Sequence, residues 1–190
     1  MTMPESQLTG SLQEYAAVLA RQLLSTKHLD VIFQSGVFLQ SEFDQTTETL
    51  ICDELAECLA LAGAKVARLQ AARLTDGEGL VTLSAEISAQ VSGKVWNKPP
   101  RSLRETVCQA TSGGDTLVLI LREIETLGCT QEGVRVLRAL KACRDAVNLV
   151  PDGQGRFLLV GVGKPRAIAA LTGDSMQAFY GAALLAMRVS

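Results

Sequence analysis

Apolar and polar residues recur along this chain with two different periods, and each period predicts one kind of element. In the first segment, apolar residues fall three or four positions apart, at Leu12, Ala16, Leu19 and Leu23. This spacing places them on one face of a helix over about 12–26. Ser11-x-x-Glu14 is a capping box, which predicts the N-terminus of that helix.

The next two strands and the helix between them are predicted in the same way. LDVIFQSGVFL (29–39) is rich in β-branched and aromatic residues, which favours a strand, bent near Ser35 and Gly36. A helical face follows, closed by Gly63; its members are Ile51, Leu55, Cys58, Leu59 and Ala62. AKVARLQ (64–70) then predicts a short second strand.

The middle of the chain holds one ambiguous segment and one irregular segment. LVTLSAEISAQV (80–91) fits a helix and a strand equally. VWNKPPRS (95–102) is irregular, because two adjacent prolines continue neither element, and Trp96 there either plugs a sheet edge or lies exposed on a loop. Ser102-x-x-Glu105 predicts the cap of a helix that runs to about Thr111.

Two uninterrupted apolar runs dominate the second half of the chain. TLVLIL (116–121) and RFLLVGV (156–162) are typical of strands buried on both faces. Between them a helix over about 131–148 is indicated by Val136, Leu140, Cys143 and Val147. Two short helix-like segments follow the second run.

Strands that alternate with amphipathic helices predict an α/β fold, in which a mainly parallel sheet is covered by helices on both faces. We therefore expect a three-layer sandwich. The chain shows no internal repeat, low-complexity tract or linker, so we expect residues 1–190 to form a single domain.

Charge and apolar content narrow the possible partners. The formal net charge is −2 and 47% of the residues are apolar, so no overall charge draws the protein to nucleic acid or to a membrane surface. No apolar run approaches the roughly 18–20 residues that span a bilayer, and the N-terminus lacks a signal-peptide pattern. We expect a cytoplasmic protein without a membrane partner.

The cysteines do not form a metal-ligand pattern. Five are present, none in C-x-x-C spacing: Cys52, Cys58, Cys108, Cys129 and Cys143. His28, the single histidine, is far from all of them in sequence. A zinc site or a Cys-His nucleophile is therefore not expected, and most of the thiols are predicted to be core residues.

The segment from Thr116 to Gly181, about a third of the chain, resembles the second half of a bacterial AAA-type P-loop ATPase. LVLILREIETL (117–127) is similar to a Walker B strand, and VLRALKACRDAVN (136–148) is similar to the helix after it. RFLLVGVGKPRAIAAL (156–171), followed by DSMQAFYGA (174–182), is similar to the sensor 1 strand and the elements after it. The resemblance implies a P-loop NTPase-like AAA core.

The residues that the family uses for catalysis are altered here. In place of G-x-x-x-x-G-K-[ST], residues 40–47 read QSEFDQTT, so that Gln40 and Gln45 replace the glycines, Thr46 replaces the lysine and Thr47 alone fits. Glu42 and Asp44 would place negative charge beside the phosphates, and Phe43 would fill their space. The resemblance thus implies a degenerate phosphate loop.

Walker B and sensor 1 are altered as well. Arg122 stands where the magnesium aspartate belongs, Glu123 matches the catalytic glutamate, and Val162 replaces the polar sensor residue. Losing the lysine, the glycines and the metal ligand together removes most of the electrostatic stabilisation that phosphoryl transfer needs. We therefore expect no cofactor. ATP and magnesium would be the cofactors only if the site is active.

Each candidate residue also has a plain structural interpretation. Thr46, Thr47 and Thr49 either contact a phosphate or cap a helix, and Glu123 is either a general base or a strand-end carboxylate. Arg122 either substitutes for a metal charge or forms an ion pair with Glu42 or Asp44.

Two further sets of basic residues have open roles. In GVGKPR (161–166), Lys164 lies in strand-to-helix context but outside either phosphate-loop spacing. Four basic residues lie opposite the apolar face of the 131–148 helix, and they form a solvated face, a phosphate-contact surface or an interface: Arg135, Arg138, Lys141 and Arg144. The family resemblance also permits Arg144 to reach into a neighbouring subunit.

These patterns predict a non-catalytic, P-loop NTPase-like regulatory or scaffolding subunit that binds a protein partner, either an active ATPase relative or a second copy of itself. We expect no helical lid after the core. One alternative is an active ATP-binding protein or ATPase with an atypical phosphate loop, which retains Thr47 and Glu123. A second alternative is a DNA-associated adaptor that uses the basic face of the 131–148 helix.

Overall fold

A computed structural model describes residues 5–25, 36–92, 102–149 and 155–187. Within these ranges five strands form one sheet in the order β2-β3-β4-β1-β5. Each neighbouring pair is parallel. The strands are β1 (Val37–Gln40), β2 (Lys65–Gln70), β3 (Thr116–Arg122), β4 (Arg156–Gly163) and β5 (Ala183–Ala186).

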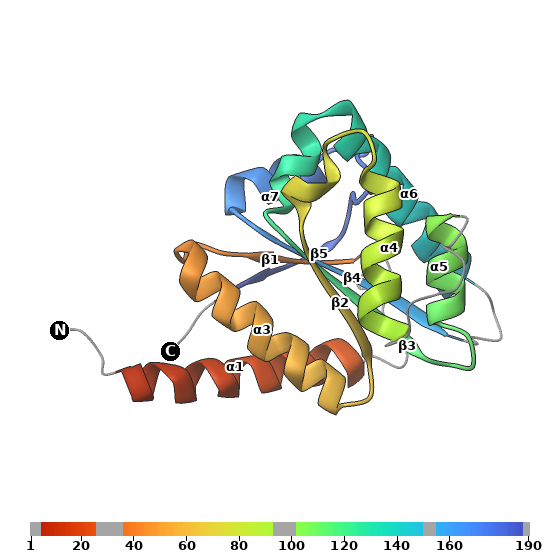
Figure 1. Ribbon diagram of the computed structural model, residues 1–190. Coiled ribbons are helices and arrows are strands. Elements are labelled where there is room, and N and C mark those ends of the chain that lie inside the picture. The colour runs from red at the N-terminus through yellow and green to blue at the C-terminus, as the bar shows by residue number, and fades with distance from the viewer. Residues whose placement is uncertain (1–4, 26–35, 93–101, 150–154, 188–190) are drawn as a thin grey trace.

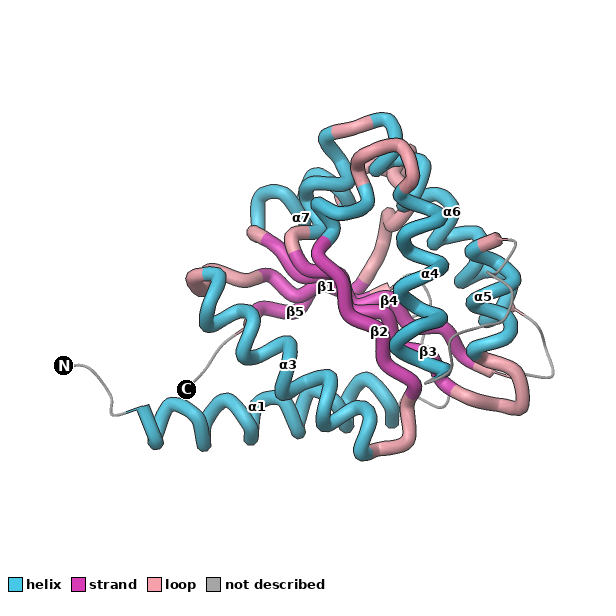
Figure 2. Tube along the Cα trace, viewed as in Figure 1, coloured by secondary structure: helices cyan, strands magenta, loops and turns pink. Residues whose placement is uncertain are grey.

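Helices cover both faces of this sheet, as Figures 1 and 2 show. α1 and α3 lie on one face, and α4, α5, α6 and α7 lie on the other. The helices are α1 (Glu5–Ser25), α3 (Gln45–Leu61), α4 (Gly79–Ser92), α5 (Leu103–Ala110), α6 (Gln131–Asn148) and α7 (Pro165–Thr172), with 3₁₀ turns η1 (Ala71–Leu74) and η2 (Ile124–Cys129). The predicted α/β three-layer sandwich with a parallel sheet is confirmed.

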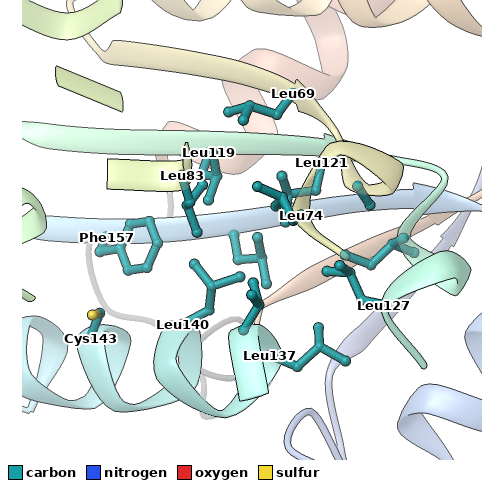
Figure 3. Packing of buried hydrophobic residues seen from close by; sticks show 14 of the residues in the cluster. Leu69, Leu74, Leu83, Leu119, Leu121, Leu127, Leu137, Leu140, Cys143 and Phe157 are labelled. Atoms are coloured by element: carbon teal, nitrogen blue, oxygen red, sulfur yellow. The ribbon is translucent and has the colours of Figure 1, made fainter. Parts of the chain in front are cut away.

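Two apolar layers hold the sandwich together, because successive side chains of a strand point to opposite faces. Leu117, Leu119 and Leu121 of β3 pack on the α4–α7 side. Val118 and Ile120, between them, pack on the α1–α3 side. Figure 3 shows the first layer, where Leu137, Leu140 and Cys143 of α6 approach the sheet.

Three predictions about elements need correction or completion. The first helix begins at Glu5, so Ser11 lies inside it and is not its cap. The ambiguous segment LVTLSAEISAQV belongs to the helix α4. The last segment, predicted as a short helix, contains β5, which pairs with β1 from Val37↔Ala183 to Gln40↔Ala186. Pairing there satisfies backbone groups that β1 would otherwise leave open along its edge.

Other predictions hold or lie outside the described residues. Ser102 caps α5, where its hydroxyl accepts a bond from the backbone N–H of Glu105 at 3.2 Å. The predicted bend at Ser35 and the environment of Trp96 lie outside the described ranges. In the described part of the chain, no helix combines the length and the apolarity needed to span a membrane.

The cysteines differ in burial, and Cys58 is half-buried. Cys52 and Cys143 are buried, as predicted, and burial raises the pKa of Cys52 to about 12 and that of Cys143 to about 11. Cys108 and Cys129 are exposed, so the prediction that most thiols are core residues is wrong for them. Among the described residues, no group of three or more His, Cys, Asp or Glu side chains is placed to hold a metal ion.

Candidate nucleotide site

The turn from β1 into α3 lies where a phosphate loop is expected, and it is closed by its own carboxylate. Asp44 is the N-cap of α3, and its carboxylate accepts bonds from the backbone N–H groups of Thr46 and Thr47, each at 3.0 Å. The Thr47 hydroxyl donates to the same carboxylate at 2.9 Å. These backbone N–H groups are the ones that a helix N-terminus would offer to a phosphate.

The protonation of Asp44 reflects these bonds. The N–H and the hydroxyl of Thr47 hold the pKa of the Asp44 carboxyl below its ordinary value of 3.8. The group is therefore an anion at neutral pH, seated on the positive end of the helix dipole. Asp44 was not predicted as a cap, although an aspartate directly before a helical pattern is a sequence signal for one.

Other groups of the turn are also engaged. The backbone N–H of the buried Ser41 donates to the Gly163 carbonyl at 2.9 Å, which ties the turn to the end of β4. Lys164 donates to the Phe43 carbonyl at 2.7 Å, and its ammonium lies 4.0 Å from the buried Glu48 carboxylate. The lysine considered as a phosphate ligand thus bonds to the turn itself.

Glu123 lies next to this turn, at the end of β3. Its backbone is left-handed, with φ of 54° and ψ of 41°, and it is the single non-glycine residue with positive φ in the described ranges. Its carboxylate accepts a bond from the Gln45 amide at 2.7 Å and a longer one from the Gln70 amide at 3.4 Å. The structure therefore joins two predicted site residues, Gln45 and Glu123, and holds the carboxylate with amides.

Arg122 makes a different contact from the predicted ones. Its guanidinium donates to the Thr49 hydroxyl in the second turn of α3. No ion pair of Arg122 with Glu42 or Asp44 is present among the described side chains. The register of β3 explains this, because Arg122 pairs with Gln70 and lies on the α3 face, beyond the first turn of the helix. Its positive charge opposes a divalent cation at that position.

The electrostatics of the turn are unfavourable for a nucleotide. Carboxylates surround the helix N-terminus, from Asp44, Glu48 and Glu123. A phosphate that approached the N–H groups of Thr46 and Thr47 would have to displace Asp44 and would meet the other two charges. The arrangement can stabilise a turn, but it leaves few free donors for an incoming anion.

The basic face of α6 is smaller than predicted. Arg135, Arg138 and Lys141 are exposed, whereas Arg144 is buried with a relative exposure of 8%. The Arg144 guanidinium bonds to Asp145 and lies 5.9 Å from the centroid of the Phe179 ring.

Arg144 therefore does not belong to the exposed basic face of α6. The buried face of α6 is wider than the predicted apolar face. Leu137, Leu140 and Arg144 are all buried, and they follow each other at spacings of three and four positions. Of the exposed three, Arg135 pairs with Glu132 and Lys141 lies 3.7 Å from Asp145.

Comparison with known proteins identifies the fold class first. No protein-family model matches the chain, and no curated protein matches its sequence. Solved structures do match over nearly the whole chain, and together with the parallel five-stranded sheet they show a P-loop NTPase-like fold of the AAA core type.

Three of the matching structures contain ORC proteins. The ORC2 protein of Aeropyrum pernix, in ADPNP-ADP complexes, aligns with a TM-score of 0.59 at 15% identity, over 92% of this chain and 46% of that chain. Drosophila ORC bound to GC-rich DNA and Cdc6 aligns with a TM-score of 0.62 at 16% identity, over 98% and 30%. The ORC1 protein of Aeropyrum pernix in complex with DNA aligns with a TM-score of 0.51 at 13% identity, over 98% and 46%. This chain therefore spans less than half the length of these proteins.

Proposed function

We propose that this chain is a non-catalytic, P-loop NTPase-like protein that acts as a regulatory or scaffolding subunit by binding another protein. The observation that carries the proposal is the Asp44 carboxylate on the N-terminus of α3. A side chain of the protein occupies the donors that a nucleotide phosphate uses in a working P-loop.

The residues at the end of β3 support the same function. Arg122 places a cation where a magnesium ligand belongs, and the Glu123 carboxylate is bound by amides of Gln45 and Gln70. A general base that orients water needs a metal-bound phosphate in front of it, and the residues here offer neither the metal ligand nor the phosphate cradle.

The partner surface we favour lies beside β5, which is an edge strand of the described sheet. Large apolar side chains are exposed there: Met176 at 85%, Tyr180 at 56% and Leu184 at 44%. Exposed apolar groups beside an edge strand suit a protein contact. The partner would be an AAA-type ATPase relative or a second copy of this chain.

Two assays test the proposal. Steady-state ATP hydrolysis with magnesium should be no faster for the wild type than for Glu123→Gln, and a clear loss of activity in that variant would establish an ATPase instead. Sedimentation velocity, with the chain alone and with an AAA-type ATPase, should detect a complex. Tyr180→Ser with Leu184→Ser should weaken that complex, whereas the matched exposed substitution Val81→Ser on α4 should leave it unchanged.

DNA binding is the second candidate function, because two of the similar structures, Drosophila ORC and the Aeropyrum pernix ORC1 protein, are complexes with DNA. On this chain the surface would be Arg135 and Arg138 of α6, which are exposed beside a hollow of about 600 Å³. Binding to duplex DNA should then fall steeply with salt and be reduced in Arg135→Gln with Arg138→Gln. Unchanged binding in that variant would remove α6 as the contact surface.

A further inference from the structure

A polar cavity of about 390 Å³ lies beside β2, on the α3 face of the sheet. Its polar lining consists of Arg68, Gln70, Arg73, Gln90, Arg122 and Asp53. The three arginines come from different elements: β2, the 3₁₀ turn η1 and β3. The lining holds three guanidiniums and one carboxylate, and a second carboxylate, Glu86, pairs with Arg73. The arginines thus outnumber these carboxylates by one, in a chain whose net charge is −2.

Strand register explains why these groups converge. Arg68 is paired with Ile120 and Gln70 with Arg122, so Arg68 and Arg122 are diagonal neighbours on one face of the sheet. Gln90 of α4 reaches around the edge of β2, where its amide accepts from the Arg68 N–H at 2.9 Å and donates to the Arg68 carbonyl at 3.0 Å. This amide closes the strand edge and forms one wall of the cavity.

Each arginine is held by one contact and keeps further donors. Arg68 pairs with Asp53, Arg73 with Glu86 at 2.7 Å, and Arg122 with the Thr49 hydroxyl. A guanidinium has five N–H donors, so these single partners leave most of them open. The side chains of Arg68 and Arg73 remain 47% and 57% exposed.

We propose that this cavity binds a small phosphate-bearing molecule, a phosphate monoester or diphosphate that carries two or more negative charges. Planar guanidinium forks match the oxygens of phosphate in pairs, and three forks from three elements suit a tetrahedral group better than a flat carboxylate. Its volume is that of small-molecule sites in proteins. Leu69, Ile120 and Cys52, which are buried, complete the lining of the cavity.

This site is separate from the turn between β1 and α3. None of its lining residues belongs to 40–47, and its donors are side chains, whereas the phosphate loop of a P-loop protein uses backbone N–H groups. Binding there needs no magnesium, because the arginines themselves neutralise the phosphate charge. A positive result in this cavity and a failure of the proposed function are therefore distinguishable.

The test is calorimetric titration of the full chain with inorganic pyrophosphate in the presence of EDTA, with citrate as the carboxylate comparison. The wild type should bind pyrophosphate more tightly than citrate. Arg68→Gln or Arg73→Gln should weaken pyrophosphate binding by about tenfold or more, as expected when a charge-assisted hydrogen bond is lost. Thr47→Ala, in the turn between β1 and α3, should leave it unchanged.

A matched control separates a built site from general charge. Arg135→Gln with Arg138→Gln makes the same charge change as Arg68→Gln with Arg73→Gln, but on α6, outside the cavity. An equal loss of binding in both double variants, stronger binding of citrate, or no binding of pyrophosphate would overturn the proposal. If Arg68→Gln shows a lowered Tm, Arg68→Lys replaces it, because lysine keeps the charge but removes the planar fork. The Arg68→Lys variant should bind pyrophosphate more weakly than the wild type and more tightly than the double variant Arg68→Lys with Arg73→Gln.

Discussion

The N-terminus of α3 and the cavity beside β2 treat an anion in opposite ways. At the first, the helix N–H donors of Thr46 and Thr47 are already bonded to Asp44, and Glu48 and Glu123 add negative charge. At the second, three arginines face one carboxylate. The fold would predict an anion at the helix N-terminus, but the arginines gather at the strand edge.

Arg122 connects the two regions. Its guanidinium bonds to Thr49 of α3 and also lines the cavity. A carboxylate in its place would serve a metal at the nucleotide site, whereas the arginine adds charge to the cavity. Arg122 thus opposes a metal ion in the first region and adds positive charge to the second. Fold alone does not locate function.

The largest expected effect is a difference in reactivity between Cys52, which lines the cavity, and the exposed thiols. Burial raises the pKa of Cys52 from 9.0 to about 12, which lowers the thiolate fraction near neutral pH about a thousandfold. In native protein, iodoacetamide should modify the exposed Cys108 and Cys129 first and leave Cys52 intact, as measured by mass spectrometry. Rapid modification of Cys52 would mean that the cavity opens deeper into the core than the structure shows.

Charge reversal should break the contrast between the two regions. Arg68→Glu with Arg73→Glu should lower pyrophosphate affinity about a hundredfold or more, because two attractions become repulsions. Arg135→Glu with Arg138→Glu should change it by less than about threefold, since exposed charges outside the cavity are screened by salt. Calorimetry on both double variants gives the ratio of their pyrophosphate affinities. Equal losses would assign the attraction to net charge and not to the cavity.

Removing the opposing carboxylate should sharpen the contrast. Asp53→Asn releases Arg68 from its ion pair and removes the one negative charge of the lining. Pyrophosphate should then bind severalfold more tightly, at little expense in stability, because the pair is half exposed. Weaker binding in this variant would show that Asp53 positions Arg68 for the ligand instead of competing with it.

The smallest effect is expected at the helix cap, and it depends on pH. Because the folded state lowers the pKa of Asp44, the cap stabilises the protein above the ordinary value of 3.8 and loses this effect as pH falls through the folded pKa. Asp44→Ala should lower Tm by a few degrees at pH 7. The difference from the wild type should stay constant down to about pH 5 and shrink towards pH 3. Thermal melts across this range measure it, and a difference that grew at low pH would contradict the cap.

Much of the fold could be predicted because its signals are local. The apolar runs TLVLIL and RFLLVGV became β3 and β4, and the Ser102 cap begins α5 as predicted. Where the local signal was weak, tertiary contacts decided. ALLA (183–186) has no strong period, and it became β5 by pairing with β1. Arg144 has a polar side chain, but it packs under Phe179 because the buried stripe of α6 is wide.

The site was predictable only in part, for the same reason. The Asp44 cap involves neighbours in sequence, so a cap signal could have located it. The bond between Gln45 and Glu123 joins residues 78 positions apart, and the cavity depends on the register of β2 against β3. Neither follows from spacing along the chain, because strand register is set by packing across the whole sheet.

The most direct test of the central claim is titration of the chain with ATP, with and without magnesium, by calorimetry. The background should be Arg68→Gln with Arg73→Gln, so that the cavity beside β2 does not contribute. With Asp44 on the helix N-terminus, we expect no binding at millimolar nucleotide in either condition. Magnesium-dependent binding in the micromolar range, lost in Thr47→Ala or Glu123→Gln, would contradict the account and establish a working nucleotide site.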